Sequence, residues 1–75
     1  MTQIGELIKN ELERQERSIT WFAKKLNIDR SNAYRMFKKN SIDTEMLLKI
    51  SIVLRKDFFR YLSEEYESRQ NMQQI

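Results

Sequence analysis

The sequence predicts a compact all-α domain built from five helices. With no proline and one glycine in 75 residues, the chain holds few residues that break helices. Its apolar residues recur every three or four positions, which is the period of a helix with one buried face. We therefore expect one helical domain over residues 1–66, followed by a polar tail over residues 67–75 that frays.

The apolar runs in the chain are short. The longest contain two or three residues, such as Ile52–Leu54. A membrane span and the core of a signal peptide both need a longer run. We therefore expect a cytoplasmic protein that makes no membrane contact.

Each apolar stripe follows a residue whose side chain can cap the start of a helix. The five expected caps are Thr2, Ser18, Asp29, Asp43 and Asp57. The first helix should end near residue 17 and the second at residue 27. A loop over residues 38–42 should separate the third helix from the fourth.

Asn27 stands where the second helix must stop and turn into the third. Asparagine tolerates the left-handed backbone conformation better than any residue except glycine. Ala23, one turn earlier, has a side chain small enough for two short helices to approach closely. The positions that face the shared interior are all apolar, which is typical of a helix-turn-helix: Phe22, Ala23, Leu26, Ile28, Ala33 and Met36.

Basic residues concentrate in the middle of the chain. Residues 14–39 hold eight basic and two acidic residues, a charge of +6, and the rest of the chain holds six basic and nine acidic residues, a charge of −3. A basic centre flanked by acidic ends is the charge pattern expected of a nucleic-acid-binding protein. The alternative interpretation is a solvated helix face with no partner.

Two segments, Phe22–Met36 and Asp43–Leu54, are similar to the core of the phage-repressor and Cro-like helix-turn-helix domains, the XRE family. The resemblance covers about Ile4 to Leu62. It implies a lambda-repressor-like fold of five helices, with the helix-turn-helix at the second and third. It also implies that the third helix, about residues 30–37, lies in the major groove of DNA.

The resemblance assigns roles to individual side chains. Arginine can bind guanine through two hydrogen bonds, and asparagine can bind adenine in the same way. The expected base-reading residues are Arg30, Ser31, Asn32 and Arg35. The expected contacts to the DNA backbone come from Ser18, Thr20, Tyr34, Lys38, Lys39 and Asn40.

The chain departs from the family pattern at three positions. Ile19 replaces the glutamine that commonly opens the second helix and touches DNA, so this contact is not expected here. Asn27 replaces the usual glycine of the turn, which is a mild change. Arg55 stands where a glycine or asparagine usually ends the fourth helix, and we expect it to alter the turn into the fifth.

The aromatic pair Phe58 and Phe59 indicates a subunit interface. Adjacent residues cannot both be buried by the same face of a helix, so one ring should join the core with Leu62. The other ring should be exposed, and exposed apolar side chains often mark an interface. The expected homodimer interface therefore draws on Phe58, Phe59, Tyr61 and Leu62; the alternative is that the fourth helix and the tail cover both rings.

The composition gives no sign of catalysis. The chain has no histidine and no cysteine, and it has no glycine-rich phosphate-binding loop. We therefore expect neither an enzyme nor a protein that binds a metal, a cofactor or a small-molecule ligand.

The sequence as a whole predicts a small transcriptional regulator, repressor-like, that binds double-stranded DNA sequence-specifically as a homodimer. The alternative is a protein-interaction module that keeps the helix-turn-helix fold and has lost DNA readout. In that case Ile19 and Trp21 would belong to an apolar contact patch. The two hypotheses differ in whether these side chains lie exposed on the same surface as Arg30 and Arg35.

Overall fold

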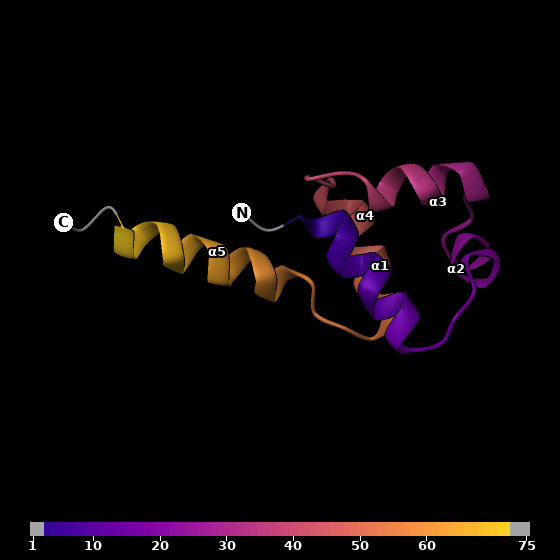
Figure 1. The fold of residues 1–75 in the computed structure, drawn as a ribbon, viewed down its shortest axis with the longest axis horizontal. Coiled ribbons are helices and arrows are strands. Elements are labelled where there is room, and N and C mark those ends of the chain that lie inside the picture. The colour runs from indigo at the N-terminus through magenta and orange to yellow at the C-terminus, as the bar shows by residue number, and fades with distance from the viewer. Residues whose placement is uncertain (1–2, 73–75) are drawn as a thin grey trace.

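The computed structural model describes residues 3–72 and confirms an all-α architecture of five helices (Figure 1). The helices are α1 (Ile4–Arg14), α2 (Ile19–Leu26), α3 (Arg30–Phe37), α4 (Thr44–Leu54) and α5 (Phe59–Met72). Within the described residues, no helix is both long enough and apolar enough to cross a membrane.

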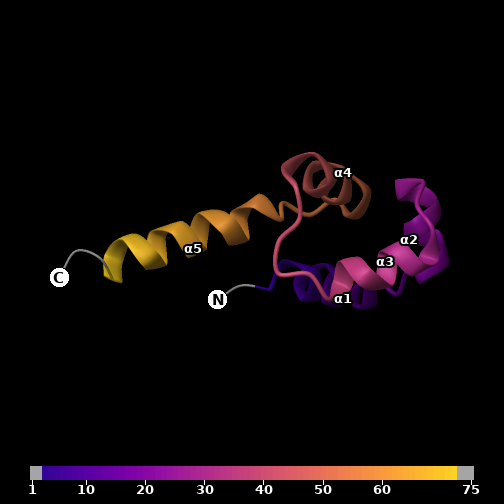
Figure 2. The ribbon, with the colours of Figure 1, turned by 90° about the horizontal axis from the view of Figure 1, so that it is seen from above.

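Helices α1 to α4 pack together as a body, and α5 extends away from them. Both ribbon views show α5 leaving the body on the side opposite α2 and α3 (Figures 1 and 2). The molecule is consequently elongated, with extents of 46 × 20 × 20 Å. The acidic C-terminal helix and the predicted reading helix α3 are thus held at opposite ends of the protein.

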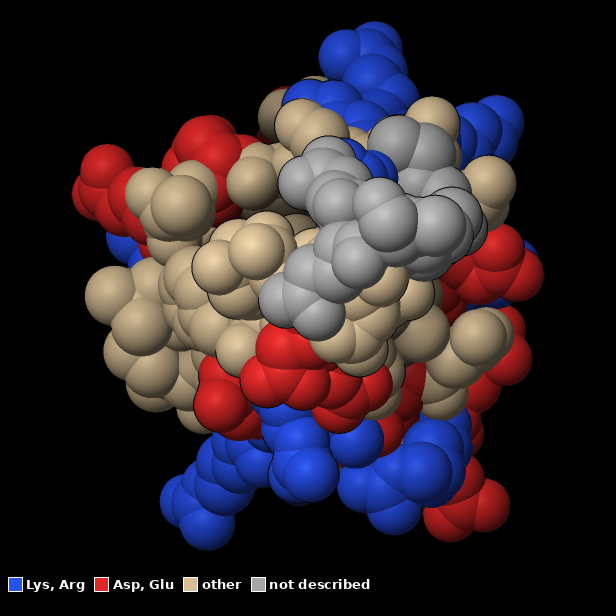
Figure 3. Space-filling model, turned by 90° about the vertical axis from the view of Figure 1, so that its left-hand side faces the viewer, with Lys and Arg blue, Asp and Glu red and all other residues tan. Residues whose placement is uncertain are grey.

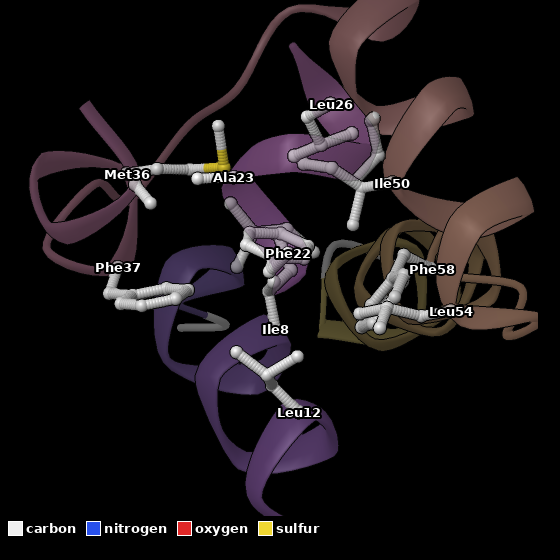
Figure 4. Close-up of a cluster of buried hydrophobic side chains, with 13 residues drawn as sticks. Ile8, Leu12, Phe22, Ala23, Leu26, Met36, Phe37, Ile50, Leu54 and Phe58 are labelled. Atoms are coloured by element: carbon white, nitrogen blue, oxygen red, sulfur yellow. The ribbon is translucent and has the colours of Figure 1, made fainter. Parts of the chain in front are cut away.

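The core lies between the helices of the body, with Phe22 of α2 near its centre (Figure 4). The Phe22 ring is fully buried and stacks on Phe37 of α3, with 5.8 Å between the ring centroids. Of the six positions predicted to face the interior of the helix-turn-helix, five are buried and Ile28 is half-buried. The remaining core side chains are Ile4, Ile8, Leu12, Leu47, Ile50, Leu54 and Phe58.

Three of the predicted caps are confirmed by hydrogen bonds. Ser18 Oγ accepts from Trp21 N at 3.0 Å, and Asp43 Oδ1 accepts from Met46 N at 2.8 Å. Asp57 Oδ1 accepts from Phe59 N, the first residue of α5, at 3.0 Å. These bonds satisfy backbone donors that the first turn of a helix leaves unpaired.

The other two caps differ from the prediction. Asp29 occupies the N-cap position of α3, but its side chain makes no capping hydrogen bond. The cap predicted at Thr2 lies outside the described residues, and Gln3 occupies the N-cap position of α1. The negative charge of Asp29 still lies at the positive end of the α3 dipole.

Three residues other than glycine end or connect helices in the left-handed conformation. Asn27 ends α2 with φ 57° and ψ 47°, which confirms the predicted turn. Arg55 ends α4 with φ 54°, so it takes the conformation that a glycine would take there. Glu16, with φ 57°, stops α1 at Arg14, three residues earlier than predicted.

Helix α5 continues beyond the predicted boundary at residue 66. Residues 67–72 are helical and continue α5, within the segment that the sequence predicts to be a frayed tail. Arg60 pairs with Glu64 at 3.3 Å and Arg69 pairs with Glu65 at 3.6 Å, one turn apart in each case. Pairs with this spacing support a helix, and the segment contains no residue that would break one. Residues 73–75 of the predicted tail lie outside the described residues.

A buried carboxylate, Glu11, joins the end of α1 to the turn that follows α4. Glu11 is 6% exposed and accepts hydrogen bonds from Arg14 Nη2 at 2.6 Å and from Gln15 Nε2 at 2.7 Å. Gln15 Nε2 also donates to the carbonyl of Leu54 at 2.8 Å, and Lys56 Nζ lies 3.8 Å from Glu11. The hydrogen bonds from Arg14 lower the pKa of Glu11 to about 2, against the opposing effect of burial.

The lowered pKa of Glu11 predicts a loss of stability in acid. Because the folded protein holds this proton less tightly than the unfolded chain, the stabilisation is complete above about pH 5. It is lost as the pH falls towards 2, and it amounts to on the order of 1–2 kcal/mol because the exposed Arg14 is screened by solvent. Glu11→Gln should be less stable at neutral pH and should lose less stability between pH 5 and 2. Urea denaturation of both proteins across this range measures the difference, and identical pH profiles would contradict the role of Glu11.

Candidate nucleic-acid interface

Helix α3 presents an almost entirely polar face to solvent. It buries Ala33, Met36 and Phe37 against the body, and these three positions fix its rotation. The rotation leaves all four predicted base-reading side chains exposed: Arg30, Ser31, Asn32 and Arg35. The structure therefore brings these residues together on one accessible surface.

The polar side chains of α3 are weakly held. Arg30 Nη1 donates to Thr20 Oγ1 at 3.5 Å, and Arg35 Nη1 donates to Asn32 Oδ1 at 3.4 Å. Both hydrogen bonds are long and exposed, so they cost little to break. The two guanidinium groups can therefore exchange these partners for a ligand.

The predicted backbone-contacting residues border this face on two sides. Thr20, near the start of α2, touches Arg30, and Ser18 lies two residues before it. Ser18 Oγ already accepts the capping hydrogen bond from Trp21 N, but its hydroxyl can still donate to a phosphate oxygen. At the other end of α3, the side chains of Lys38, Lys39 and Asn40 are exposed.

Tyr34 is 53% exposed on the same helix. Its ring meets the ring of Phe37 edge to face, with 6.5 Å between the centroids. Phe37 therefore holds the base of the ring while the rest of it faces solvent. In this position the Tyr34 hydroxyl is free to donate a hydrogen bond to an acceptor such as a phosphate oxygen.

The charged side chains that α3 and the loop after it contribute to this surface are all basic, and the carboxylates of Glu6 and Asp43 border it. Residues 30–40 contain four basic and no acidic residues. None of these four cations forms an ion pair within the described residues 3–72. By contrast, the view from the α5 side shows acidic and basic side chains interspersed around uncharged ones (Figure 3).

The structure places Ile19 and Trp21 on different sides of α2, and both are half-buried against the core. Ile19 lines a shallow hollow of about 220 Å³ together with Tyr34, Phe37 and Lys38. Trp21 faces the ends of α1 and α4 instead, where Arg17 lies 4.5 Å from the centre of its ring. The two side chains therefore do not form the single apolar patch that the alternative hypothesis requires.

The structure corrects the predicted dimer interface at Phe58. This ring is fully buried in the core of its own chain, so it cannot contact a second subunit. Phe59 and Tyr61 are half-buried, and Leu62 is 45% exposed rather than packed in the core. Tyr66, one turn beyond Leu62 and 65% exposed, extends this apolar stripe and was absent from the predicted interface.

The described residues hold no group of three His, Cys, Asp or Glu side chains placed to bind a metal ion. No protein-family model, curated protein or solved structure matches the chain.

Proposed function

We propose that the protein is a small transcriptional regulator of the XRE type that binds double-stranded DNA through α3. The observation that supports this most strongly is the exposed face of α3, where two arginines that form no ion pair within residues 3–72 stand beside a serine and an asparagine. These side chains are the types that read base edges in the major groove. Lys38, Lys39 and Asn40 on one side, and Thr20 on the other, would hold the flanking phosphates.

A homodimer fits the exposed stripe on α5. Leu62 and Tyr66 lie one helical turn apart, and each exposes about half or more of its surface. An isolated helix with an apolar stripe gains stability by burying it against a partner. Two copies joined in this way would present two α3 helices to half-sites about 34 Å apart.

The protein-interaction alternative loses its main support in this arrangement. It needed Ile19 and Trp21 to form one exposed patch beside Arg30 and Arg35. Ile19 instead adjoins Tyr34 and Lys38, where it would face the sugar-phosphate chain, and Trp21 lies on another side of α2. The basic face of α3 is therefore left accessible to DNA.

Selection of bound duplexes from a random DNA pool at physiological salt tests the proposal directly. We expect recovery of a two-fold symmetric motif, because a symmetric dimer reads the same sequence twice. A pool with no enriched sequence would refute base reading. An enriched motif without symmetry would refute the dimer alone.

Replacing Arg35 with alanine is expected to weaken binding to the selected site by about 1–3 kcal/mol, with a smaller effect on unrelated DNA. The physical reason is the loss of two hydrogen bonds to one base. Fluorescence anisotropy with both duplexes measures the difference. Arg60→Ala is a matched control, because Arg60 is an exposed arginine on α5, remote from α3. An equal loss on both duplexes would show that Arg35 contacts phosphate only.

The affinity should also fall steeply as salt rises, since basic side chains displace counterions from DNA. Replacing Lys38 and Lys39 together with alanine should reduce the slope of log affinity against log salt by about 2, one for each phosphate contact. The double variant should keep the sequence preference of the wild type. An unchanged slope would contradict the assignment of these two lysines to the DNA backbone.

A further inference from the structure

A second basic surface lies away from α3, at the junction of α1, α2 and α4. The ends of these helices enclose a hollow of about 690 Å³, open to solvent, which we call the Trp21 groove. Its charged lining residues are all basic: Arg14, Arg17, Lys25 and Arg55. No residue of α3 lines it, so the proposed DNA-reading face does not account for it.

Within the part of the chain that the structure describes, three of these four cations form no ion pair. Arg14 is committed to the buried Glu11 at 2.6 Å. Arg17, Lys25 and Arg55 form no ion pair within residues 3–72. Three like charges around one hollow repel each other, and an anion bound between them would relieve this repulsion.

The indole of Trp21 organises the groove. The guanidinium carbon of Arg17 lies 4.5 Å from the ring centroid and Lys25 Nζ lies 6.0 Å from it. Contact of a cation with a ring face holds the cation in place while leaving its hydrogen-bond donors free. Arg55 ends α4 and lines the groove from there. Its left-handed backbone conformation turns the chain away from the helix at this residue.

The groove also has an apolar edge. Ile52 lines it and is 67% exposed, and Leu48, one turn earlier on α4, is 52% exposed. These two residues and the stripe on α5 supply four of the five large hydrophobic side chains that are exposed in the described part of the chain. An apolar edge beside cations and a tryptophan resembles the centre of a protein–protein contact, where tryptophan and arginine contribute most of the binding energy.

We propose that the Trp21 groove binds an acidic segment of a partner protein, one that carries an aliphatic or aromatic side chain among its carboxylates. The carboxylates would pair with Arg17, Lys25 and Arg55, and the apolar side chain would cover Ile52 and the edge of Trp21. The sugar-phosphate chain of DNA would bury less of the apolar surface of Ile52 and Leu48 than an aliphatic or aromatic side chain would. This inference does not depend on DNA binding by α3.

The experiment is a selection of random displayed peptides on the immobilised full chain. We expect the bound peptides to be enriched in aspartate and glutamate together with leucine, isoleucine or phenylalanine. Trp21 is the only tryptophan in the chain, so its fluorescence reports directly on occupancy by a selected peptide that lacks tryptophan. Selected peptides without acidic enrichment would overturn the proposal.

Charge reversal then tests the location. Lys25→Glu should weaken the selected peptides roughly tenfold, because an attractive charge becomes repulsive at the contact. Lys24→Glu is the matched control: Lys24 is exposed on the same helix and does not line the groove, so affinity should change little. Equal effects of the two variants would show only a general charge effect and would overturn the proposal. Ile52→Ser, an exposed substitution that leaves the core intact, should also weaken the peptides.

Two further outcomes would assign the groove to another occupant. If Lys25→Glu weakens binding to unrelated DNA as strongly as the loss of Lys38 and Lys39 does, the groove holds a phosphate chain. If the emission of Trp21 changes with protein concentration alone, and Lys25→Glu abolishes that change, a second copy of the chain occupies it. Either result would overturn an acidic partner segment and leave the role of α3 untouched.

Discussion

Replacing Gly5 with alanine is expected to destabilise the domain by about 3 kcal/mol, at the upper end of the cost of overpacking a core. A Cβ at Gly5 would lie 2.7 Å from the carbonyl oxygen of Phe37 and 2.8 Å from that of Lys39, and it would also collide with the carbonyl of Met36. All three obstacles are backbone atoms, which cannot rotate aside. The backbone N–H of Gly5 also donates to the Lys39 carbonyl at 3.1 Å, so α1 would have to move and break this bond.

Thermal and urea denaturation measure the effect of Gly5→Ala. Asn10→Ala is the control, because residue 10 is exposed on the same helix and alanine there should leave stability equal or slightly higher. The end of α3 and the loop after it should shift in Gly5→Ala, so DNA affinity should fall even where the protein remains folded. A melting temperature equal to that of the wild type would contradict this prediction, because it would show that α1 can move away from α3 with no loss in the free energy of unfolding.

Replacing Phe58 with alanine is expected to cost about 3–5 kcal/mol, the usual range for a fully buried phenylalanine. Phe58 is the last core residue before α5 and packs in the body beside Leu54 (Figure 4). Its ring lies 6.0 Å from that of Tyr61, and its backbone N–H donates to Ser51 Oγ at 3.4 Å. The stability of a chain of this length is on the order of 4–11 kcal/mol, so the variant should lose a large share of it and melt at a clearly lower temperature.

Phe59→Ala is the matched control for Phe58→Ala. The two residues are neighbours of identical chemistry, but Phe59 is half-buried at the first turn of α5. Its replacement should cost clearly less stability, and it should weaken self-association if the stripe on α5 joins two copies. Similar losses of stability in the two variants would contradict the difference in burial between Phe58 and Phe59.

The helices themselves could be predicted from the sequence because their determinants are local. Ser18, Asp43 and Asp57 cap the helices that follow them, and Asn27 turns the chain, through bonds that span at most five residues. The interior positions of the helix-turn-helix followed from helical spacing alone. In the same way, the exposure of Arg30, Ser31, Asn32 and Arg35 follows from the burial of Ala33, Met36 and Phe37 on the other face of α3.

What could not be predicted depends on contacts between distant segments. Local spacing cannot decide which of Phe58 and Phe59 enters the core, because the choice depends on where the turn after α4 directs α5. The need for glycine at position 5 arises from backbone atoms more than thirty residues away. The Trp21 groove likewise combines residues at the ends of α1, α2 and α4. No single segment of the sequence shows that the basic side chains from these helix ends line one groove.

The projection of α5 from the body bears on how such a protein would select its operators. A helix of 14 residues is about 21 Å long, and each added residue extends it by about 1.5 Å and turns it by about 100°. In the proposed dimer, an insertion between Phe59 and Leu62 would therefore turn each reading head about its own α5 and change the distance between the two heads. Operator spacing and phase would then be encoded in a segment that never touches DNA, and relatives with identical α3 faces could serve separate sets of genes.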